Sequence, residues 1–177
     1  NQVNQSPQIS VTHGGIRTLT LSIGARTMAQ HPSESEERMM YRLLAFIHSA
    51  HEDLKFTKGL SSVDEPELWQ MSLTGEILHW IELGLPDEKR IKQASGKSKR
   101  VSIYTYHKNK TADWLPKIKE KISKNEKVNI YSIEVSESTS IENLVEKSMK
   151  LTCLIEDGFM YLANDHERIE IEIIKNL

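Results

Sequence analysis

Three carboxylates of this 177-residue chain can act together if the fold brings them to one place: Asp64, Glu65 and Glu82. The segments 66–72 and 76–83 are rich in apolar residues and flank a turn-like Ser-Leu-Thr-Gly sequence, so they predict a β-hairpin. If the turn is centred between the second and third of these residues, Glu65 lies opposite Glu82 and Asp64 follows one step further along. The hairpin is therefore predicted to collect all three acids at one end.

Such a collection of acids needs something to offset its charge. Two carboxylates about 4 Å apart repel by roughly 4 kcal/mol at an effective dielectric constant near 20, and like charges directly opposite each other destabilise a sheet. A shared proton, a basic side chain or a divalent metal ion would each relieve the repulsion. Oxygen ligands suit Mg²⁺ or Mn²⁺ better than zinc. The alternative is an ordinary solvated hairpin end that Arg38 or Lys89 neutralises.

Basic residues are concentrated in one part of the chain. Residues 89–127 carry 13 lysines and arginines against three acids, whereas the remainder carries 10 basic and 22 acidic residues. A basic segment beside an acidic remainder favours a polyanion, such as DNA or RNA, as the partner. The competing interpretation is a solvated surface whose lysines keep the protein soluble.

The strand that ends at Glu82 is apolar on both faces, which is typical of a strand in the middle of a sheet. Two capping boxes, one at Ser33 and Glu36 and the other at Thr139 and Glu142, predict the starts of helices. Hydrophobic periodicity and turn signals complete the pattern. The predicted strands are residues 16–26, 54–60, 66–72, 76–83, 101–106, 128–135, 151–156, 159–162 and 169–173, the predicted helices are residues 34–54, 86–95, 111–124 and 139–147, and an Asp-Gly turn is predicted at 157–158.

These elements predict one α/β (α+β) domain over residues 1–177, with a C-terminal β-hairpin or meander. Residues 1–8 are expected to be a disordered or partial tail. The single cysteine, Cys153, is incompatible with a disulfide framework and favours a cytoplasmic location. No apolar run approaches 18 residues, so no membrane-spanning helix is expected, and a monomer is favoured.

Several segments resemble the bacterial YaeQ family. The most specific is Trp-Ile-Glu-Leu-Gly-Leu-Pro-Asp-Glu, and the resemblance extends from about Met28 to the C-terminus. It implies a variant of the PD-(D/E)XK nuclease fold, in which a mixed sheet with flanking helices carries metal-binding acids on a central hairpin. The segments that carry the resemblance are residues 31–34, 37–40, 56–57, 59–60, 64–67, 80–88, 90–92 and 159–165.

The resemblance implies roles for individual residues. Asp64 matches the acid of the first hairpin strand and Glu82 the acid of the second, and with the carbonyl of Leu83 they would hold Mg²⁺ or Mn²⁺. Glu37, on the first predicted helix, matches an accessory acid that many members of the superfamily use. A metal held in this way would lower the pKa of a bound water and polarise a phosphate oxygen.

One position departs from the family pattern. A lysine is expected two residues after the second acid, and this chain has Gly84 there. In some members of the superfamily the lysine lies on the following helix, which makes Lys92 the first candidate, with Lys89 and Arg90 behind it. A lysine's long stem can reach back toward Glu82. The competing interpretation is that these are ordinary exposed helix charges.

Two functions are consistent with these features. The first is a metal-dependent, nuclease-like protein that acts on the phosphodiesters of DNA or RNA. The second is a non-catalytic nucleic-acid-binding or transcription-associated module on a degenerate nuclease scaffold, which the missing strand lysine favours because a fold does not fix a function. In the first, the residues expected to be catalytic are Asp64, Glu82, Lys92 and Glu37, and those expected to grip the phosphate backbone are Lys89, Arg90, Lys117 and Lys121.

Overall fold

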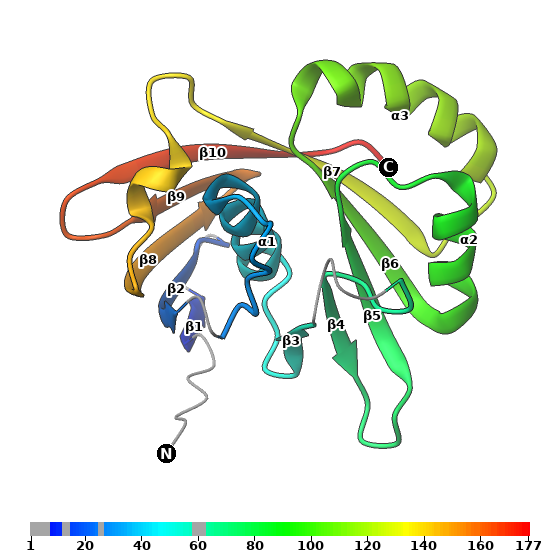
Figure 1. The fold of residues 1–177 in the computed structure, drawn as a ribbon, viewed down its shortest axis with the longest axis horizontal. Helices are drawn as coiled ribbons and strands as arrows, with labels where there is room; N and C mark the ends of the chain where they lie inside the picture. Colours follow the sequence, from blue (N-terminus) through cyan, green and yellow to red (C-terminus); the bar gives the residue numbers. More distant parts are fainter. Residues whose placement is uncertain (1–7, 12–14, 25–26, 58–62) are drawn as a thin grey trace.

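The computed structural model describes residues 8–11, 15–24, 27–57 and 63–177. Within these ranges ten strands form one sheet in the order β1-β2-β8-β9-β10-β7-β6-β5-β4-β3 (Figure 1). The strands are β1 (Gln8–Val11), β2 (Arg17–Gly24), β3 (Leu54–Phe56), β4 (Leu68–Met71), β5 (Ile77–Leu83), β6 (Ser98–Thr105), β7 (Val128–Val135), β8 (Ser148–Glu156), β9 (Phe159–Ala163) and β10 (Arg168–Lys175). The helices are α1 (Glu36–His48), α2 (Glu88–Lys97), α3 (Lys108–Ile122) and the short 3₁₀ helix η2 (Ile141–Leu144).

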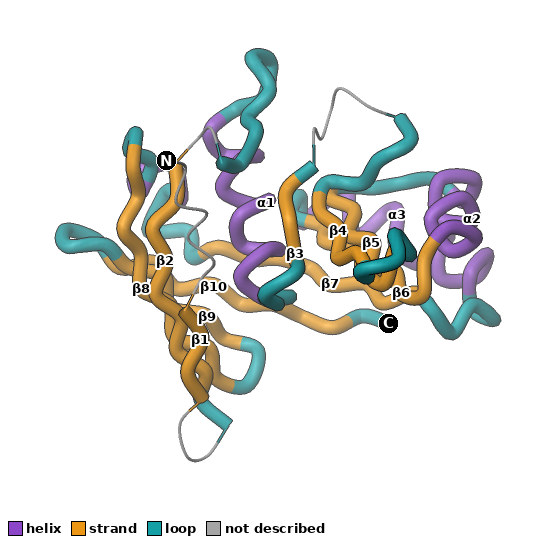
Figure 2. The backbone as a smooth tube through the Cα atoms, turned by 90° about the horizontal axis from the view of Figure 1, so that it is seen from below, coloured by secondary structure: helices purple, strands orange, loops and turns teal. Residues whose placement is uncertain are grey.

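Helix α1 lies inside the curve of this sheet. Figures 1 and 2 show β1, β2, β8 and β9 on one side of it and β3 to β5 on the other. Residues 39–47 of α1 are all buried, and they share a core with the inner faces of β2, β5 and β7 to β10. A helix that is apolar on nearly every side is expected where its surroundings bury it all round, and the curled sheet provides that burial.

Helices α2 and α3 cover the opposite face of β5, β6 and β7. They form a second core whose largest member is Trp80, which is completely buried. Trp114 fixes α3 to the segment before α2, because its indole N–H donates to the carbonyl of Pro86 at 2.9 Å. Ile81, next to Trp80, belongs to the core around α1. Strand β5 is therefore covered on both faces, as its sequence predicts.

The sheet is mixed, which confirms the predicted architecture. Strands β5, β6 and β7 are parallel, and α2 and α3 form the crossovers that parallel neighbours require. The hairpin of β4 with β5 and the meander of β8, β9 and β10 are antiparallel, and β10 then pairs with β7. The hairpin turn is confirmed at Asp157 and Gly158, whose φ angles are 48° and 83°, as a two-residue turn of this kind requires.

The first predicted capping box is wrong. Helix α1 begins after Ser35, whose hydroxyl accepts the backbone N–H of Arg38 at 3.1 Å. Ser33 is engaged elsewhere, because its hydroxyl lies 2.6 Å from Nδ1 of His31. The helix also ends at His48, six residues before the predicted end.

The second predicted capping box is also wrong, because the segment after it forms only the single 3₁₀ turn η2. The hydroxyl of Thr139 donates instead to the carbonyl of Ser136 at 3.4 Å. Helix α3 starts three residues earlier than predicted, and Pro116 lies inside it. Strand β1 has no counterpart among the predicted elements. Of the predicted tail at 1–8, residues 1–7 lie outside the described residues and Gln8 begins β1. The predicted strand ends at 25–26 and 58–60 also lie outside them.

None of the helices in the described ranges is long and apolar enough to cross a membrane.

Candidate functional site

The hairpin of β4 and β5 brings Glu67 close to Glu82, where Glu65 was expected. Leu68 pairs with Ile81 in the antiparallel ladder, and the backbone N–H of Glu67 donates to the carbonyl of Ile81 at 3.0 Å. The register therefore differs by two residues from the predicted one, and Glu67 takes the place nearest to the second acid.

Two local features cause this shift. The backbone N–H of Ser72 donates to the carbonyl of Glu76 at 2.8 Å, so the turn is centred on Thr74 and not before it. The ladder then changes register once more between Gln70 and Met71, where a β-bulge interrupts it. A bulge sets two residues of one strand against one residue of the other, and each feature moves the pairing by one residue.

Glu82 is buried and already has two donors. The indole N–H of Trp80 and the Nε–H of Arg90 both donate to its Oε1 at 2.8 Å. The residue is only 7% exposed. Burial raises the pKa of the Glu82 carboxyl above its ordinary value and the charge of Glu67 adds to this, while the donors from Trp80 and Arg90 act in the opposite direction.

Arg90 ties Glu82 to the segment that precedes β4. Its guanidinium donates to the carbonyl of Val63 and, through Nη2 at 2.7 Å, to the carbonyl of Glu65. Its Cζ lies 5.2 Å from the centre of the Trp80 ring, within the range of a cation–π contact. Asp87 fixes the start of α2, because its side chain accepts the backbone N–H of Arg90 at 2.8 Å. The basic group that reaches the second acid is therefore an arginine on the following helix.

Glu67 is paired with arginines of a different helix. Nη2 of Arg38 lies 2.5 Å from Oε1 of Glu67, and Nη1 of Arg38 lies 2.5 Å from Oε2 of Glu34. Arg42 lies 2.6 Å from the second oxygen of Glu34 and 3.9 Å from Glu67. Because Arg42 is only 1% exposed, this network is an internal one, and Arg38 and Arg42 share two carboxylates between them.

The buried charges of this site balance, since three carboxylates face three guanidinium groups. Buried charges are tolerated when they are paired and hydrogen-bonded in this way. Residues 8–11, 15–24, 27–57 and 63–177 contain no group of three or more His, Cys, Asp or Glu side chains placed to hold a metal ion. As arranged, the site does not fit Mg²⁺ or Mn²⁺, because arginines hold the carboxylates a metal would need. The paired residues are Glu34, Glu67, Glu82, Arg38, Arg42 and Arg90.

Two of the residues predicted to be catalytic have other partners. The carboxylate of Asp64 is 77% exposed and lies 3.9 Å from Nζ of Lys97. The ammonium of Lys92 is directed to Glu88, one turn back on α2, at 3.1 Å. Among the ion pairs of the described residues neither reaches Glu82, and Arg90 takes the position that was expected for Lys92.

The other predicted residues lie apart from this centre. Glu37 lies beside Glu142, and the pKa of the Glu37 carboxyl is raised first by burial and then by that neighbour. The side chain of Leu83 belongs to the core around α1, and its backbone pairs with Tyr104 in the ladder of β5 and β6. The predicted substrate-binding residues Lys89, Lys117 and Lys121 are exposed on α2 and α3, whereas Arg90 is half-buried.

The backbone explains why no lysine follows two residues after Glu82. Gly84 has φ +106°, and its N–H donates to the carbonyl of Tyr104 at 2.8 Å. A side chain at such an angle strains the backbone even though no atom lies within 4 Å of a built Cβ. The chain leaves β5 by a turn that favours glycine, so a lysine of the usual pattern is disfavoured here.

The sequence alone indicated no role for Glu34, Glu67 or Arg42 at this centre. A signal exists for part of the network, because Glu34, Arg38 and Arg42 recur at intervals of four, the spacing of one helix face. Glu67 has no such signal, since its position depends on the bulge. Trp80 was assigned to the strand without a polar role, although a buried indole N–H needs an acceptor.

Comparison with known proteins agrees with this architecture. The family model described as "YaeQ protein" matches residues 20–173. A protein of Salmonella typhi described as "Uncharacterized protein YaeQ" is 37% identical over 149 residues, which cover 84% of this chain and 82% of that protein. The protein of the same description from Escherichia coli (strain K12) is 36% identical over 147 residues, 83% of this chain and 81% of that one.

Two crystal structures share the fold. The YaeQ protein from Xanthomonas axonopodis pv. citri has a TM-score of 0.75 and 33% sequence identity, and the match covers 83% of each chain. The YaeQ protein from Pseudomonas syringae has a TM-score of 0.75 and 34% identity, and the match covers 84% of this chain and 82% of that one.

Proposed function

Because this chain belongs to the YaeQ family, whose curated relatives are described as uncharacterised, we propose its function from the geometry of the site. The chain binds nucleic acid without cleaving it. It does so through a basic surface formed by Lys89 of α2 with Lys117 and Lys121 of α3. Its buried acids stabilise the fold. The observation that carries this proposal is that every buried carboxylate of the site is paired with an arginine of the same chain.

The pairing supports a structural role for the acids. A carboxylate that binds a metal must give its oxygens to that metal, whereas Oε1 of Glu82 already accepts from both Trp80 and Arg90. Glu67 and Glu82 lie close together, and arginines of two different helices hold them. Removing one partner from such a buried pair costs about 3–5 kcal/mol. The arrangement in which each carboxylate keeps its arginine is therefore the stable one.

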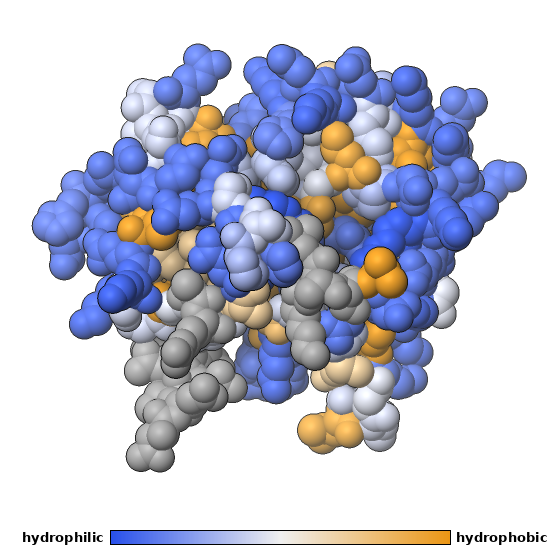
Figure 3. All heavy atoms as spheres, viewed as in Figure 1, coloured by the Kyte–Doolittle hydropathy of each residue, from blue (hydrophilic) through white to orange (hydrophobic). Residues whose placement is uncertain are grey.

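The lysines of α2 and α3 support the binding role. Figure 3 shows hydrophilic side chains over the region of these helices. Lys117 and Lys121 are one turn apart on α3, both are exposed, and in the part of the chain that the structure describes neither has a carboxylate within 4.0 Å. Unpaired lysines on one surface attract phosphates without reading bases.

The test is a salt titration of binding. A fluorescein-labelled 20-nucleotide single strand and the matching duplex, each as DNA and as RNA, are titrated with the protein from 50 to 200 mM salt and followed by anisotropy. We expect the logarithm of the association constant to fall linearly with the logarithm of the salt concentration. Lys117→Ala with Lys121→Ala should make this slope shallower by about 1 for each phosphate that the protein no longer neutralises.

The matched control is Lys147→Ala with Lys150→Ala. Both lysines are exposed, Lys147 just before β8 and Lys150 within it. In the sheet, β8 is separated by β9 and β10 from the strands β5 to β7 that α2 and α3 cover. Removal of these lysines changes the net charge by the same amount. If both pairs weaken binding equally, or if the wild-type protein binds no probe at 50 mM salt, the proposal is wrong.

A metal-dependent nuclease is the second candidate, and one observation favours it. Two acids, Glu67 and Glu82, lie close together at one end of a hairpin, and a basic residue of the following helix reaches the second acid. A PD-(D/E)XK-like core combines a mixed sheet, flanking helices and acids on a central hairpin, and α1 with β3 to β7 is compatible with such a core. Activity would require Arg90 to leave Glu82.

Calorimetry with Mn²⁺ separates the two candidates. If the centre can hold a metal, Arg90→Ala should bind Mn²⁺ more tightly than wild type, because it frees Oε1 of Glu82. Arg90→Ala combined with Glu82→Gln should lose that gain. Circular dichroism of each variant shows whether the fold is kept. Absence of binding in a folded Arg90→Ala variant would remove the nuclease candidate.

A further inference from the structure

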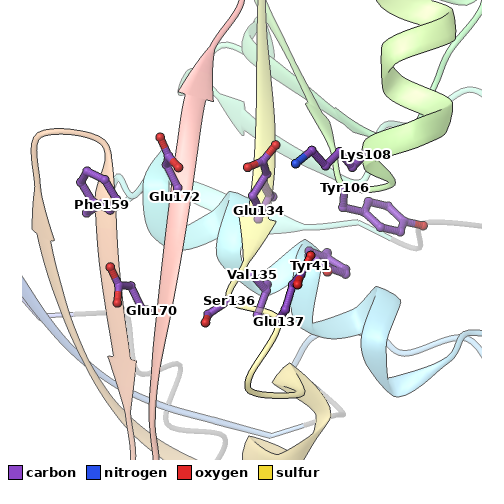
Figure 4. Close-up of a pocket in the computed structure, with 11 residues that line it drawn as sticks. Tyr41, Tyr106, Lys108, Glu134, Val135, Ser136, Glu137, Phe159, Glu170 and Glu172 are labelled. Atoms are coloured by element: carbon purple, nitrogen blue, oxygen red, sulfur yellow. The ribbon is translucent and has the colours of Figure 1, made fainter.

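A cavity of about 440 Å³ lies away from the arginine-rich site, between β7, β10, the start of β9, α1 and the start of α3. Figure 4 shows Glu134, Glu170 and Glu172 on the strand side of it, and two tyrosines with Glu137 on the other side. Its volume is in the range of small-molecule sites. Its lining includes the carboxylates of Glu134, Glu170 and Glu172 and the aromatic rings of Phe159, Tyr41 and Tyr106.

The strand register gathers the carboxylates of this cavity. Glu172 of β10 is paired directly with Glu134 of β7 on one side and with Phe159 of β9 on the other. Glu170 lies two residues before Glu172, so its side chain stands on the same face of β10. Like charges directly opposite each other destabilise a sheet. No basic side chain lies within 4.0 Å of these three carboxylates in the described residues.

Aromatic rings form the opposite wall. The rings of Tyr41 and Tyr106 are stacked, with their centres 4.4 Å apart and their planes at 18°. The pKa of the Tyr41 hydroxyl is raised to about 12, first by burial and then by the charges of Glu37 and Glu142. The negative potential therefore extends around the aromatic pair, and a cation near the ring faces would be attracted by both.

A smaller chamber beside this cavity is lined by a polar group that has no hydrogen-bond partner in the described part of the chain. This chamber, of about 40 Å³, shares Tyr106, Lys108 and Glu134 with the cavity. It is also lined by Thr111, which is only 6% exposed and whose hydroxyl oxygen has no hydrogen-bond partner among the described residues. Buried polar groups are nearly always hydrogen-bonded. An N–H donor that enters the chamber would give the hydroxyl oxygen of Thr111 its missing hydrogen bond.

The spacing of the acids argues against a single metal ion. In the described part of the chain no three of these side chains are close enough to coordinate one. Separate carboxylates along two strands, facing aromatic rings, match a longer molecule with charges at more than one point. We propose that this cavity binds a flexible organic cation with two or more ammonium or guanidinium groups.

Each part of the ligand has a partner in this arrangement. One cationic group lies between Glu134 and Glu172, a second lies near Glu170, and the aliphatic chain between them packs on Phe159. Among the described residues that line the cavity Lys108 is the only basic one, and its ammonium competes with the ligand. The inference does not rest on nucleic-acid binding by α2 and α3.

The ligand has two possible sources, a free polyamine or the basic side chains of a polypeptide. Calorimetry of the full chain at low ionic strength therefore uses two probes, spermidine and the end-blocked dipeptide Arg-Arg. We expect at least one to bind, and the tighter of the two identifies the source. Glu134→Gln and Glu172→Gln, which keep the side-chain size, should each weaken that binding about tenfold, the effect of removing one charged hydrogen bond.

Lys108→Gln provides a change of opposite sign. Removal of the competing ammonium should tighten binding by up to roughly fivefold, which a variant that merely damaged the fold would not do. Glu52→Gln is the matched control, because Glu52 is exposed in the turn after α1 and lines neither cavity. The inference is overturned if neither probe binds at millimolar concentration, or if Glu52→Gln weakens binding as much as Glu134→Gln does.

Discussion

Nε of Arg90 lies 2.8 Å from Oε1 of Glu82, and the same guanidinium donates to the carbonyls of Val63 and Glu65. One side chain of α2 thus joins a buried carboxylate of β5 to the segment that leads into β4. The segment 63–65 has no strand pairing of its own. Its attachment to the sheet depends in large part on this one arginine.

Arg90→Ala should therefore destabilise the protein by about 3–5 kcal/mol, because it leaves Glu82 buried without its cation. Urea unfolding followed by circular dichroism measures this change. Arg90→Ala combined with Glu82→Gln should recover part of the loss, since the uncompensated charge is then absent. Equal stability of the single and the double variant would contradict the assignment of Arg90 as the neutralising partner.

Gly84→Ala should cost about 1–3 kcal/mol, because φ is +106° there and a side chain strains such a backbone. The matched control is Gly96→Ala within α2, where a Cβ meets nothing within 4 Å and φ is ordinary. That change should stabilise the protein by about 0.5–1 kcal/mol, the usual gain for alanine over glycine in a helix. Thermal or urea unfolding of both variants measures the two changes in the free energy of unfolding, which should have opposite signs.

His79 is expected to stay neutral well below its usual range. Burial, followed by the charge of Arg100, lowers the pKa of His79 to about 3 from an ordinary value of 6.5. Arg100 donates to Nδ1 at 2.9 Å and Ser102 lies 2.7 Å from Nε2, an arrangement that suits the neutral ring with its proton on Nε2. NMR titration of the ring resonances should show no protonation at pH 5.

This shift makes stability depend on pH in a defined direction. Below pH 6.5 the unfolded chain binds a proton at His79 that the folded chain does not bind, so stability is lost as the pH falls from 6.5 toward 3. The loss is about 1.4 kcal/mol per pH unit for one group. His79→Gln should flatten the curve of unfolding free energy between pH 6.5 and 5. An unchanged slope would show that the imidazole is accessible to protons in the folded state.

The thiol of Cys153 should be inert in the native protein. It is only 1% exposed, and burial raises the pKa of the thiol to about 12, whereas the thiolate is the reactive form. Because the chain has a single cysteine, labelling with Ellman's reagent reports on this residue alone. Labelling should be fast in 8 M urea and limited by unfolding in buffer. Fast labelling in buffer would mean that β8 opens locally.

The regular parts of the fold follow closely from the sequence. The predicted strand 128–135 coincides with β7, and the predicted strand that ends at Leu83 differs from β5 by one residue at its start. Both are runs of β-branched and apolar residues that the sheet buries, so local preference and tertiary packing agree. The turn at Asp157 and Gly158 is also predicted correctly, because an Asp-Gly pair favours the positive φ angles that a two-residue hairpin turn requires.

The site could be predicted only in part, because it depends on pairing between distant residues. The prediction that Glu82 lies at a buried strand end is confirmed by its burial. Its neighbour Glu67 follows from a bulge that shifts the register, and nothing in the residues near Gln70 indicates one. Arg38 is predicted as a possible neutralising partner and Arg90 as a later candidate behind Lys92, but a sequence does not show which carboxylate a guanidinium will meet. The predicted metal ligands stay a prediction.

The order of strands in the sheet has a consequence for biosynthesis. Among the described strands β2 has β8 as its inner neighbour, and the pairing of β10 with β7 joins the two halves of the sheet. As the polypeptide leaves the ribosome, β2 and β7 therefore expose unpaired backbone until the last strands arrive. Such edges promote association between chains. Cells that make this protein rapidly should need a chaperone to shield it until β10 is in place.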